Sequence, residues 1–398
     1  MKKLLMAALV LVVGLAAAAG EITVWTHFGG PELEFLKTQA QRYEKATGVK
    51  VQVVEVPFND IKQKFILGAP QGEAADLVVT VPHDWVGEMA ATGVLEPVGK
   101  YATSDYLSGL MPVAVDAFSF GGRLFGLPMN AESVALIYNK DMVKTPPATW
   151  DEFLALAQKY TTGDTFGFLY DLGNPYFNYG WFKAYGGYVF GKNADGSLNP
   201  YDLGLGGEPG YKAGQFIKDL RYKYELIPEG VDYGVADGAF KDGVLAMILN
   251  GPWALGDYKK AGLNFGIAPL PAPPGGKAWG PFVGVQGVVV NAYSNNKVAA
   301  VNFAKTLVRP ENQVAFNRAG GRIPVSLAAL EKLGDDPVVE GFSTTIALGD
   351  PMPNIPEMGK VWSPWGNALS LIIRDAGSNV REIIDGMAAE IMKAIKGE

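Results

Sequence analysis

The sequence predicts an α/β protein whose chain divides into two doubly wound lobes. The chain has 398 residues, of which 48% are hydrophobic and 19% charged, which is enough to bury more than one core. Strand and helix patterns alternate from residue 21 to residue 91, and the alternation restarts after residue 149. Between these halves, residues 134–138 form a short apolar run that is typical of a buried strand.

The first half alternates strand and helix three times. Leu33, Leu36, Ala40 and Tyr43 recur at helical spacing, and Gly48 follows as a helix stop. The residues after Gly48 alternate as a strand should. We expect strands at 21–25, 49–56 and 76–81, and helices at 31–47, 60–67 and 84–91.

Such an alternation favours a mostly parallel sheet, whose ligands bind beyond the carboxyl ends of the strands. Two loops then share one rim: His27-Phe28-Gly29-Gly30, which follows the first strand, and Pro82-His83-Asp84-Trp85, which follows the third. Asp84 is therefore a candidate site residue. The alternative is that Asp84 only caps the helix that it opens.

The second half repeats the α/β pattern with unusual aromatic connections. Thr149 and Glu152 have capping-box spacing, and residues 176–182 contain five aromatic side chains. Asn250-Gly251-Pro252-Trp253 turns out of a strand and places Trp253 at its carboxyl end. We expect strands at 165–170, 244–249, 264–268 and 283–291, and helices at 150–160, 211–224, 299–308, 311–319, 367–375 and 380–395.

The N-terminus has the pattern of a cleaved secretory signal. Two lysines precede the apolar run 4–19, and Ala17-Ala18-Ala19 is a suitable cleavage site. No later stretch of 18 or more residues is continuously apolar. We therefore expect a soluble mature protein that begins near residue 20 and works in the periplasm.

Composition excludes several classes of function. There is no cysteine, so disulfides, thiol catalysis and thiolate metal sites are absent. Removing the two lysines of the signal leaves 32 basic residues against 41 acidic ones, a balance of −9 that disfavours nucleic acid. His27 and His83 have no metal-ligand spacing, and the sequence has no P-loop, no nucleophile-elbow motif and no dinucleotide fingerprint. We expect neither a metal nor a cofactor.

Glu132 lies at the start of the buried run 134–138. A carboxylate beside a buried strand must be solvated, paired or kept for a ligand, because burying it alone costs several kcal/mol. Glu132 is therefore either an ordinary surface residue at a strand end or a candidate binding residue.

The remaining chemistry is a set of aromatic and acidic side chains on connecting loops. Such a mixture suits sugar, because pyranose C–H faces stack on aromatic rings and hydroxyl groups donate hydrogen bonds to carboxylates. The same two acids would also suit a glycosidase, which needs a pair of carboxyl groups flanking the glycosidic bond. The candidate residues are Asp84, Trp85, Glu132, Tyr176, Trp253, Trp362 and Trp365.

Six stretches resemble the maltose/maltodextrin-binding proteins of bacterial ABC importers, in order from about residue 21 to the C-terminus. They are Tyr43-Glu44-Lys45-Ala46-Thr47-Gly48-Val49-Lys50-Val51, Pro82-His83-Asp84, Ala131-Glu132-Ser133 with Leu136-Ile137-Tyr138-Asn139-Lys140-Asp141, Asn250-Gly251-Pro252-Trp253, Pro281-Phe282-Val283-Gly284-Val285 and Met352-Pro353-Asn354-Ile355-Pro356.

This resemblance implies a periplasmic-binding-protein-like fold, in which two α/β lobes joined by crossover hinge segments close on an oligosaccharide. By the same resemblance, Asp84 and Glu132 accept sugar hydroxyls, and Tyr176, Trp253 and Trp362 form an aromatic platform. The implied division is 20–128 with 288–335 for the N-terminal lobe, 133–282 with 337–398 for the C-terminal lobe, and hinges near 129–132, 283–287 and 336.

The chain departs from that family at several candidate subsites. It has Asn174 where the family has an acidic residue before Pro-Tyr, Trp85 where the family has arginine, and Val81 in place of a tryptophan. The loop His27-Phe28-Gly29-Gly30-Pro31 lacks the family's lysine. We count Asn174, Trp85 and Trp365 among the expected ligand-binding residues, with an altered preference for sugar or chain length.

The sequence therefore predicts a monomeric, non-enzymatic sugar receptor that delivers maltose or maltodextrin to the membrane permease subunits of an ABC importer. The alternatives are a receptor for another α-linked disaccharide such as trehalose, a secreted glycoside hydrolase that uses Asp84 and Glu132, and a receptor of this fold for a non-sugar ligand.

Overall fold

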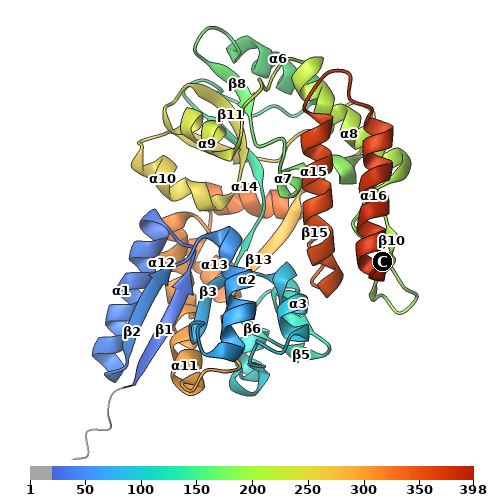
Figure 1. Cartoon of the computed structure of the whole chain (residues 1–398). Coiled ribbons are helices and arrows are strands. Elements are labelled where there is room, and N and C mark those ends of the chain that lie inside the picture. Colours follow the sequence, from blue (N-terminus) through green and yellow to red (C-terminus); the bar gives the residue numbers. More distant parts are fainter. Residues whose placement is uncertain (1–19) are drawn as a thin grey trace, which may run out of the picture.

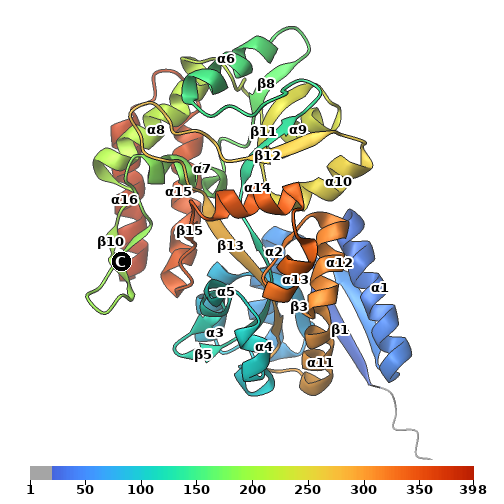
Figure 2. The same cartoon turned by 180° about the vertical axis from the view of Figure 1, so that it is seen from behind.

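The computed structural model describes residues 20–398, and the predicted signal at 1–19 lies outside this range. The described chain forms two α/β lobes, each with its own sheet and hydrophobic core (Figures 1 and 2). The predicted fold class is confirmed. No helix among residues 20–398 is long and apolar enough to cross a membrane.

The sheet of the first lobe has seven strands, with helices packed around it. The strand order is β2 (Lys50–Glu55), β1 (Glu21–Thr26), β3 (Leu77–Pro82), β13 (Phe282–Val290), β6 (Gly126–Glu132) and β14 (Ile323–Pro324), with β15 (Asp350–Pro351) beside the start of β13. Strands β1 and β2 pair in parallel, as do β1 and β3, whereas β13 runs antiparallel to both β3 and β6.

The second sheet has four strands in the order β12 (Phe265–Ala268), β7 (Ala135–Asn139), β11 (Leu245–Asn250) and β8 (Phe166–Leu169). Only β11 and β8 pair in parallel, because β7 runs antiparallel to both of its neighbours. The mostly parallel sheet was expected from residues 21–91, and β1, β2 and β3 do pair in parallel, but both sheets also contain antiparallel pairs. In the second lobe, β7 follows directly from the first lobe and not from a local β-α-β crossover.

The first lobe carries α1 (Gly30–Thr47), α2 (Phe58–Gly68), α3 (Val86–Ala91), α4 (Ser104–Ser108), α5 (Pro112–Ala117), α11 (Lys297–Leu307), α12 (Pro310–Gly320) and α13 (Leu327–Leu333). The second carries α6 (Trp150–Tyr160), α7 (Pro175–Ala184), α8 (Gly207–Tyr222), α9 (Tyr233–Lys241), α10 (Leu255–Lys260), α14 (Pro337–Ile346), α15 (Trp362–Ile372) and α16 (Val380–Lys396). The nine predicted helices correspond to α1, α2, α3, α6, α8, α11, α12, α15 and α16, with differences of a few residues at their ends, whereas α4, α5, α7, α9, α10, α13 and α14 were not predicted. Short two-stranded sheets pair β4 (Ser119–Phe120) with β5 (Arg123–Leu124) and β9 (Phe190–Lys192) with β10 (Leu198–Leu203).

Three segments pass between the lobes: one links α13 of the first lobe to α14 of the second, and the other two are a segment after β6 and the strand β13. Ala131 packs in the core of the first lobe and Val134 in that of the second. In the same way Phe282 belongs to the second core and Val285 to the first, so β13 links the two lobes (Figure 1). The predicted hinges near 129–132 and 283–287 lie at these two crossings. That the lobes rotate about them, with a third hinge at 336 and the stated lobe boundaries, stays a prediction.

Trp365 belongs to the core of the second lobe and not to a surface loop. Its side chain is 0% exposed and packs edge-on against Phe182, with the ring centres 5.0 Å apart. It lies on α15 at the buried face of the helix. The helix turns this side chain inward, so the burial of Trp365 argues against direct contact with a ligand, and its role in binding stays a prediction.

Trp365→Ala should lower the free energy of unfolding by about 3–5 kcal/mol, because it removes a large buried side chain and leaves a cavity. Chemical denaturation measures this loss. Leu371→Ala is the matched control on the same helix, since Leu371 is 41% exposed and should change stability by less than about 0.5 kcal/mol. A Trp365→Ala loss as small as that of the control would contradict the core placement.

Candidate functional site

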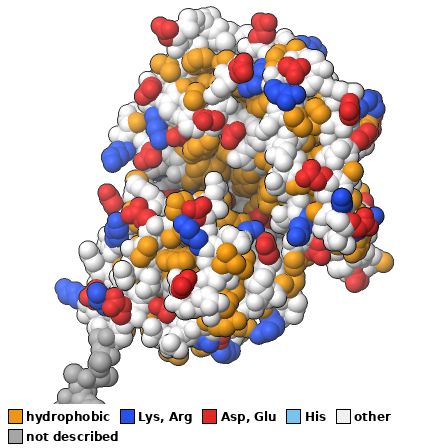
Figure 3. Space-filling view, in the orientation of Figure 1, with side chains coloured by type: hydrophobic (Ala, Val, Ile, Leu, Met, Phe, Trp, Pro, Cys, Tyr) orange, Lys and Arg blue, Asp and Glu red, His pale blue; other side chains and the backbone are white. Residues whose placement is uncertain are grey.

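Asp84 and Trp362 join the two lobes across the space between them. Asp84 lies in the 3₁₀ turn η2 (His83–Trp85) directly after β3, and Trp362 begins α15. The Trp362 indole Nε1 donates a hydrogen bond of 3.0 Å to Asp84 Oδ2. Asp84 does not cap a helix through its side chain, so the capping alternative is not supported. Seen in the orientation of Figure 1, the molecular surface is hollowed between the two lobes (Figure 3).

Asp84 is a buried acid with a perturbed pKa. Its side chain is only 5% exposed, and burial raises its pKa to about 6 because the charged form loses hydration. The Trp362 indole and the positive charge of Lys62 oppose this rise. A ligand hydroxyl that donated a hydrogen bond to Asp84 would lower this pKa further, because it would stabilise the ionised form. The carboxyl group is therefore suited to accept a hydrogen bond from a ligand.

Glu132 ends β6 and lies opposite Gly284 of β13. Its Oε1 accepts a hydrogen bond of 2.8 Å from Gln286 Nε2, and its Oε2 accepts from Arg322 Nη1. Glu132 is therefore buried and paired, and it is not the solvated surface residue of the alternative interpretation. A carboxylate offers about four lone-pair positions, so these two donors leave room for a ligand hydroxyl.

Tyr176 brings an unpaired hydroxyl group to the same place. Within residues 20–398 its buried hydroxyl has no hydrogen-bond partner. A Cβ placed on Gly284 would lie 3.4 Å from this hydroxyl and 3.0 Å from Cγ of Glu132, so both side chains converge on the glycine. A buried hydroxyl without a partner is costly, and this favours a role for Tyr176 in binding a polar ligand.

Aromatic rings extend this group along the second lobe. The ring of Tyr176 is centred 6.1 Å from Trp253 and 6.1 Å from Phe282, and Phe282 is 5.8 Å from Trp362. Trp253, Tyr176 and Trp362 are partly exposed, whereas Phe282 is buried behind them. Trp253 is oriented by its indole Nε1, which donates a hydrogen bond of 3.1 Å to the Tyr233 hydroxyl.

The other two expected ligand-binding residues have local structural contacts. Asn174 caps α7, because its Oδ1 accepts from the Tyr176 backbone N–H at 3.0 Å. Trp85 is buried and packs against Phe58 with ring centres 5.0 Å apart. Both therefore lie beside the site, and a direct role in binding stays a prediction for each.

Sequence reasoning missed Arg322 and Glu32, which form a buried charged cluster with Glu132. Arg322 Nε and Nη2 donate to the two oxygens of Glu32 at 2.6 and 3.1 Å, while Nη1 donates to Glu132. Glu32 is 100 residues before Glu132 in the chain and 290 before Arg322. No local motif signals this cluster, because sequence patterns do not place such distant charges together.

Both histidines lie in the first lobe, where His83 is buried and His27 is half-buried. His83 Nδ1 accepts from the Val285 backbone N–H at 3.0 Å, and its Nε2 donates to the Met352 carbonyl at 2.8 Å. Burial lowers the pKa of His83 to about 4 and that of His27 to about 3, so both rings are neutral at pH 7. Across residues 20–398 no group of three His, Asp or Glu side chains is arranged to hold a metal ion.

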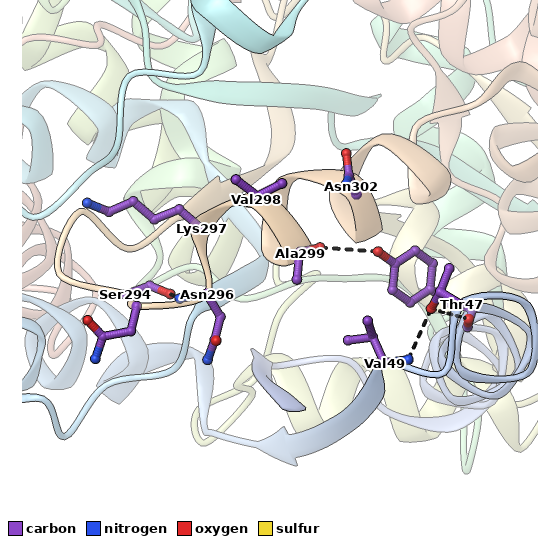
Figure 4. Close-up of a pocket in the computed structure, with 10 residues that line it drawn as sticks. Thr47, Val49, Ser294, Asn296, Lys297, Val298, Ala299 and Asn302 are labelled. Carbon is purple, nitrogen blue, oxygen red and sulfur yellow. Dashed lines mark hydrogen bonds between the residues drawn. The ribbon is translucent and has the colours of Figure 1, made fainter. Parts of the chain in front are cut away.

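A separate surface groove lies on the first lobe, between the end of α1 and the start of α11 (Figure 4). Its polar groups are largely used within the chain: the Tyr43 hydroxyl donates to the Ala299 carbonyl, and the Thr47 hydroxyl donates to the Tyr43 carbonyl. The one charged side chain in its lining, Lys297, lies 3.7 Å from Glu96. This groove lacks the acids and stacked rings that the interlobe group combines.

Comparison with known proteins gives the family. Residues 38–340 match the family described as bacterial extracellular solute-binding protein. A maltotriose-binding protein of Pyrococcus abyssi is 31% identical over 95% of this chain and 83% of its own. A galactooligosaccharide-binding protein of Bacillus subtilis is also 31% identical, over 90% of this chain and 85% of its own.

One solved structure is much more similar to this chain than the two relatives above. The maltotriose-binding protein of Thermus thermophilus, bound with maltotriose, is 72% identical and superposes with a TM-score of 0.93, covering 94% of this chain and 100% of that one. The match over residues 38–340 spans more than half of the sequence, and the relatives exceed 30% identity along most of it. The protein therefore belongs to the bacterial extracellular solute-binding protein family.

Proposed function

We propose that this protein binds maltotriose or a related maltodextrin between its lobes and delivers the sugar unchanged to the membrane subunits of an ABC importer. The observation that carries the proposal is the convergence of two buried acids and a partly exposed aromatic wall at the junction of the lobes. The 72% identity with a protein solved with maltotriose supports this choice of sugar.

The proposed roles follow from the position of each side chain. Asp84 and Glu132 accept sugar hydroxyls, which contributes about 1.5–3 kcal/mol for each charged hydrogen bond. Trp253 and Trp362 stack on the apolar faces of the pyranose rings, and the free hydroxyl of Tyr176 completes the polar contacts. Asn174 and Trp85 act through neighbours, since Asn174 fixes the start of α7 and Trp85 supports Phe58.

The hydrolase alternative fits the geometry of Glu132 less well. A nucleophilic carboxylate needs a free oxygen directed at the anomeric carbon. Both Glu132 oxygens already accept from fixed donors, Gln286 and Arg322. Asp84 has the raised pKa of a general acid, and its oxygen accepts from Trp362. We therefore propose a binding protein and not an enzyme.

The family is extracellular by description, and we propose that this member is exported to the periplasm, where it works as a monomer. Calorimetric titration of residues 20–398 with maltose, maltotriose and trehalose, followed by product analysis of the same mixtures, tests the function. We expect saturable binding that is tightest for maltotriose, with the sugar recovered intact. Cleaved sugar would support the hydrolase, and the absence of heat with all three sugars would remove the proposed ligand class.

Trp253→Ala should weaken maltotriose binding by about 2 kcal/mol or more, because it removes a stacking surface at the centre of the site. Its unfolding free energy should fall less than that of Trp365→Ala, since Trp253 is partly exposed. Trp253→Phe is the matched control, because it keeps a ring and should bind with intermediate affinity. Titration and chemical denaturation measure the two effects, and unchanged affinity in Trp253→Ala would exclude Trp253 from the platform.

Maltotriose affinity should fall by about tenfold between pH 7 and pH 5. The pKa of Asp84 in the sugar-free protein is about 6, so the acid gains a proton across this range. A sugar hydroxyl donates to the ionised form, and the proton must therefore leave before the sugar binds. The pKa values of His27 and His83, about 3 and 4, keep both rings neutral over the same range.

Asp84→Asn is the control for this pH dependence. It should bind more weakly than the parent at pH 7 and show a flatter profile between pH 7 and pH 5, because it has no proton to exchange. A parent profile as flat as that of Asp84→Asn would contradict hydroxyl donation to an ionised Asp84.

A further inference from the structure

We propose that Arg322 is a positioning residue of the sugar site, which holds the Glu132 carboxylate and the Trp253 ring in place while Glu32 holds Arg322 itself. This inference rests on the proposed function, because it explains how an acid from one lobe and a ring from the other are set for one ligand. It concerns three charged side chains that the sequence patterns did not connect.

The backbone places Arg322 opposite Glu132. Strand β14 pairs antiparallel with β6, and the partners are Ile323 with Ala131 and Pro324 with Asn130. One further step along this register brings Arg322 across from Glu132. Gly321 makes the approach possible, because it ends α12 with a φ of 83°, which favours glycine.

Charge pairing explains why all three side chains can be buried together. The side chains of Arg322, Glu32 and Glu132 are 5%, 9% and 8% exposed. Burial raises the pKa of Glu32, and the charge and hydrogen bonds of Arg322 oppose that rise. Removing the guanidinium would leave two acids in one buried place, so Arg322 is needed to keep Glu132 available as an acceptor.

The Glu132 carboxylate has little freedom to rotate. Gln286 donates to one of its oxygens and Arg322 to the other. Gln286 is itself held, since its Oε1 accepts from the Thr80 hydroxyl at 2.9 Å. Arg322 is held by two hydrogen bonds to Glu32. The lone pairs that remain on Glu132 therefore point in fixed directions.

Arg322 also reaches the other lobe. Its guanidinium carbon lies 5.8 Å from the centre of the Trp253 ring, within the range of a cation–π contact. Trp253 follows β11 of the second lobe, whereas Arg322 precedes β14 of the first. The same side chain thus contacts the acid and the ring that we assign to the sugar, and it links the position of one to the position of the other.

The first test compares maltotriose affinity by calorimetric titration in the parent, Arg322→Met and Arg322→Lys. Arg322→Met should bind at least about thirtyfold more weakly, which is the effect of removing one partner of a buried hydrogen-bonded charge pair. Arg322→Lys should recover only part of this loss, because an ammonium group cannot bridge two carboxylates as the guanidinium does. Arg318→Met, an exposed change on α12, is the matched control and should bind as the parent does.

A second variant separates positioning from stability. The double variant Arg322→Met, Glu32→Gln removes the unbalanced acid, so its thermal midpoint should recover toward that of the parent while its affinity stays low. If Arg322→Met does not fold, this double variant carries the affinity comparison. Recovery of affinity together with stability would mean that Arg322 is only structural, and it would overturn the proposal.

A double-mutant cycle tests the contact with Trp253. The loss of affinity in Arg322→Met combined with Trp253→Ala should be smaller than the product of the two separate losses, because both changes remove one contact. The cycle of Arg322→Met with Trp362→Ala should be multiplicative, since Trp362 contacts Asp84 instead. Multiplicative losses in both cycles would remove Trp253 from the proposal.

The maltodextrin affinity of the parent protein distinguishes a failure of the proposed function from a failure of the role of Arg322. A parent protein that binds no maltodextrin would overturn the proposed function and this proposal together. A parent that binds maltotriose while Arg322→Met binds within threefold of it would overturn the role of Arg322 alone.

Discussion

The charge on Glu132 must be compensated where the two lobes meet, and the rest of the site depends on how this is done. Gln286 and Arg322 hold its two oxygens, and Glu32 holds Arg322 in turn. Because these partners come from β13, the start of β14 and α1, the acid can be buried only when distant parts of the chain have come together. The carboxylate is thereby fixed before any ligand arrives.

The second lobe supplies aromatic rings to the candidate site, and the first lobe supplies the charged side chains. Its rings form a continuous series from Trp253 through Tyr176 and Phe282 to Trp362, and the last of these meets Asp84 across the junction. Burial of Asp84 and the unpaired Tyr176 hydroxyl are both unfavourable in the sugar-free protein. A polyhydroxyl ligand offsets both, which gives a physical reason for the lobes to hold a sugar between them.

The sequence predicted the elements of the fold better than their directions. Apolar spacing and the glycine at position 48 located α1, and each predicted strand fell near its range, but β6, which carries Glu132, was not predicted. The directions of β7 and β13 depend on which lobe the chain enters from, and a local pattern does not contain that information.

Site residues that directly follow a strand could be predicted from the sequence. A residue whose contact partners lie far away in the sequence could not. Asp84 and Trp253 were identified because they follow buried strands, whereas Arg322 was missed because its partners precede it by 190 and 290 residues. The burial of Trp365 was not predicted, because it depends on how α15 is oriented against the core.

The most direct test of the site is a crystal structure with maltotriose. It should show sugar hydroxyls bonded to Asp84 and Glu132 with the Arg322 pairing intact, and a sugar bound elsewhere, or Arg322 turned away from Glu132, would contradict the account.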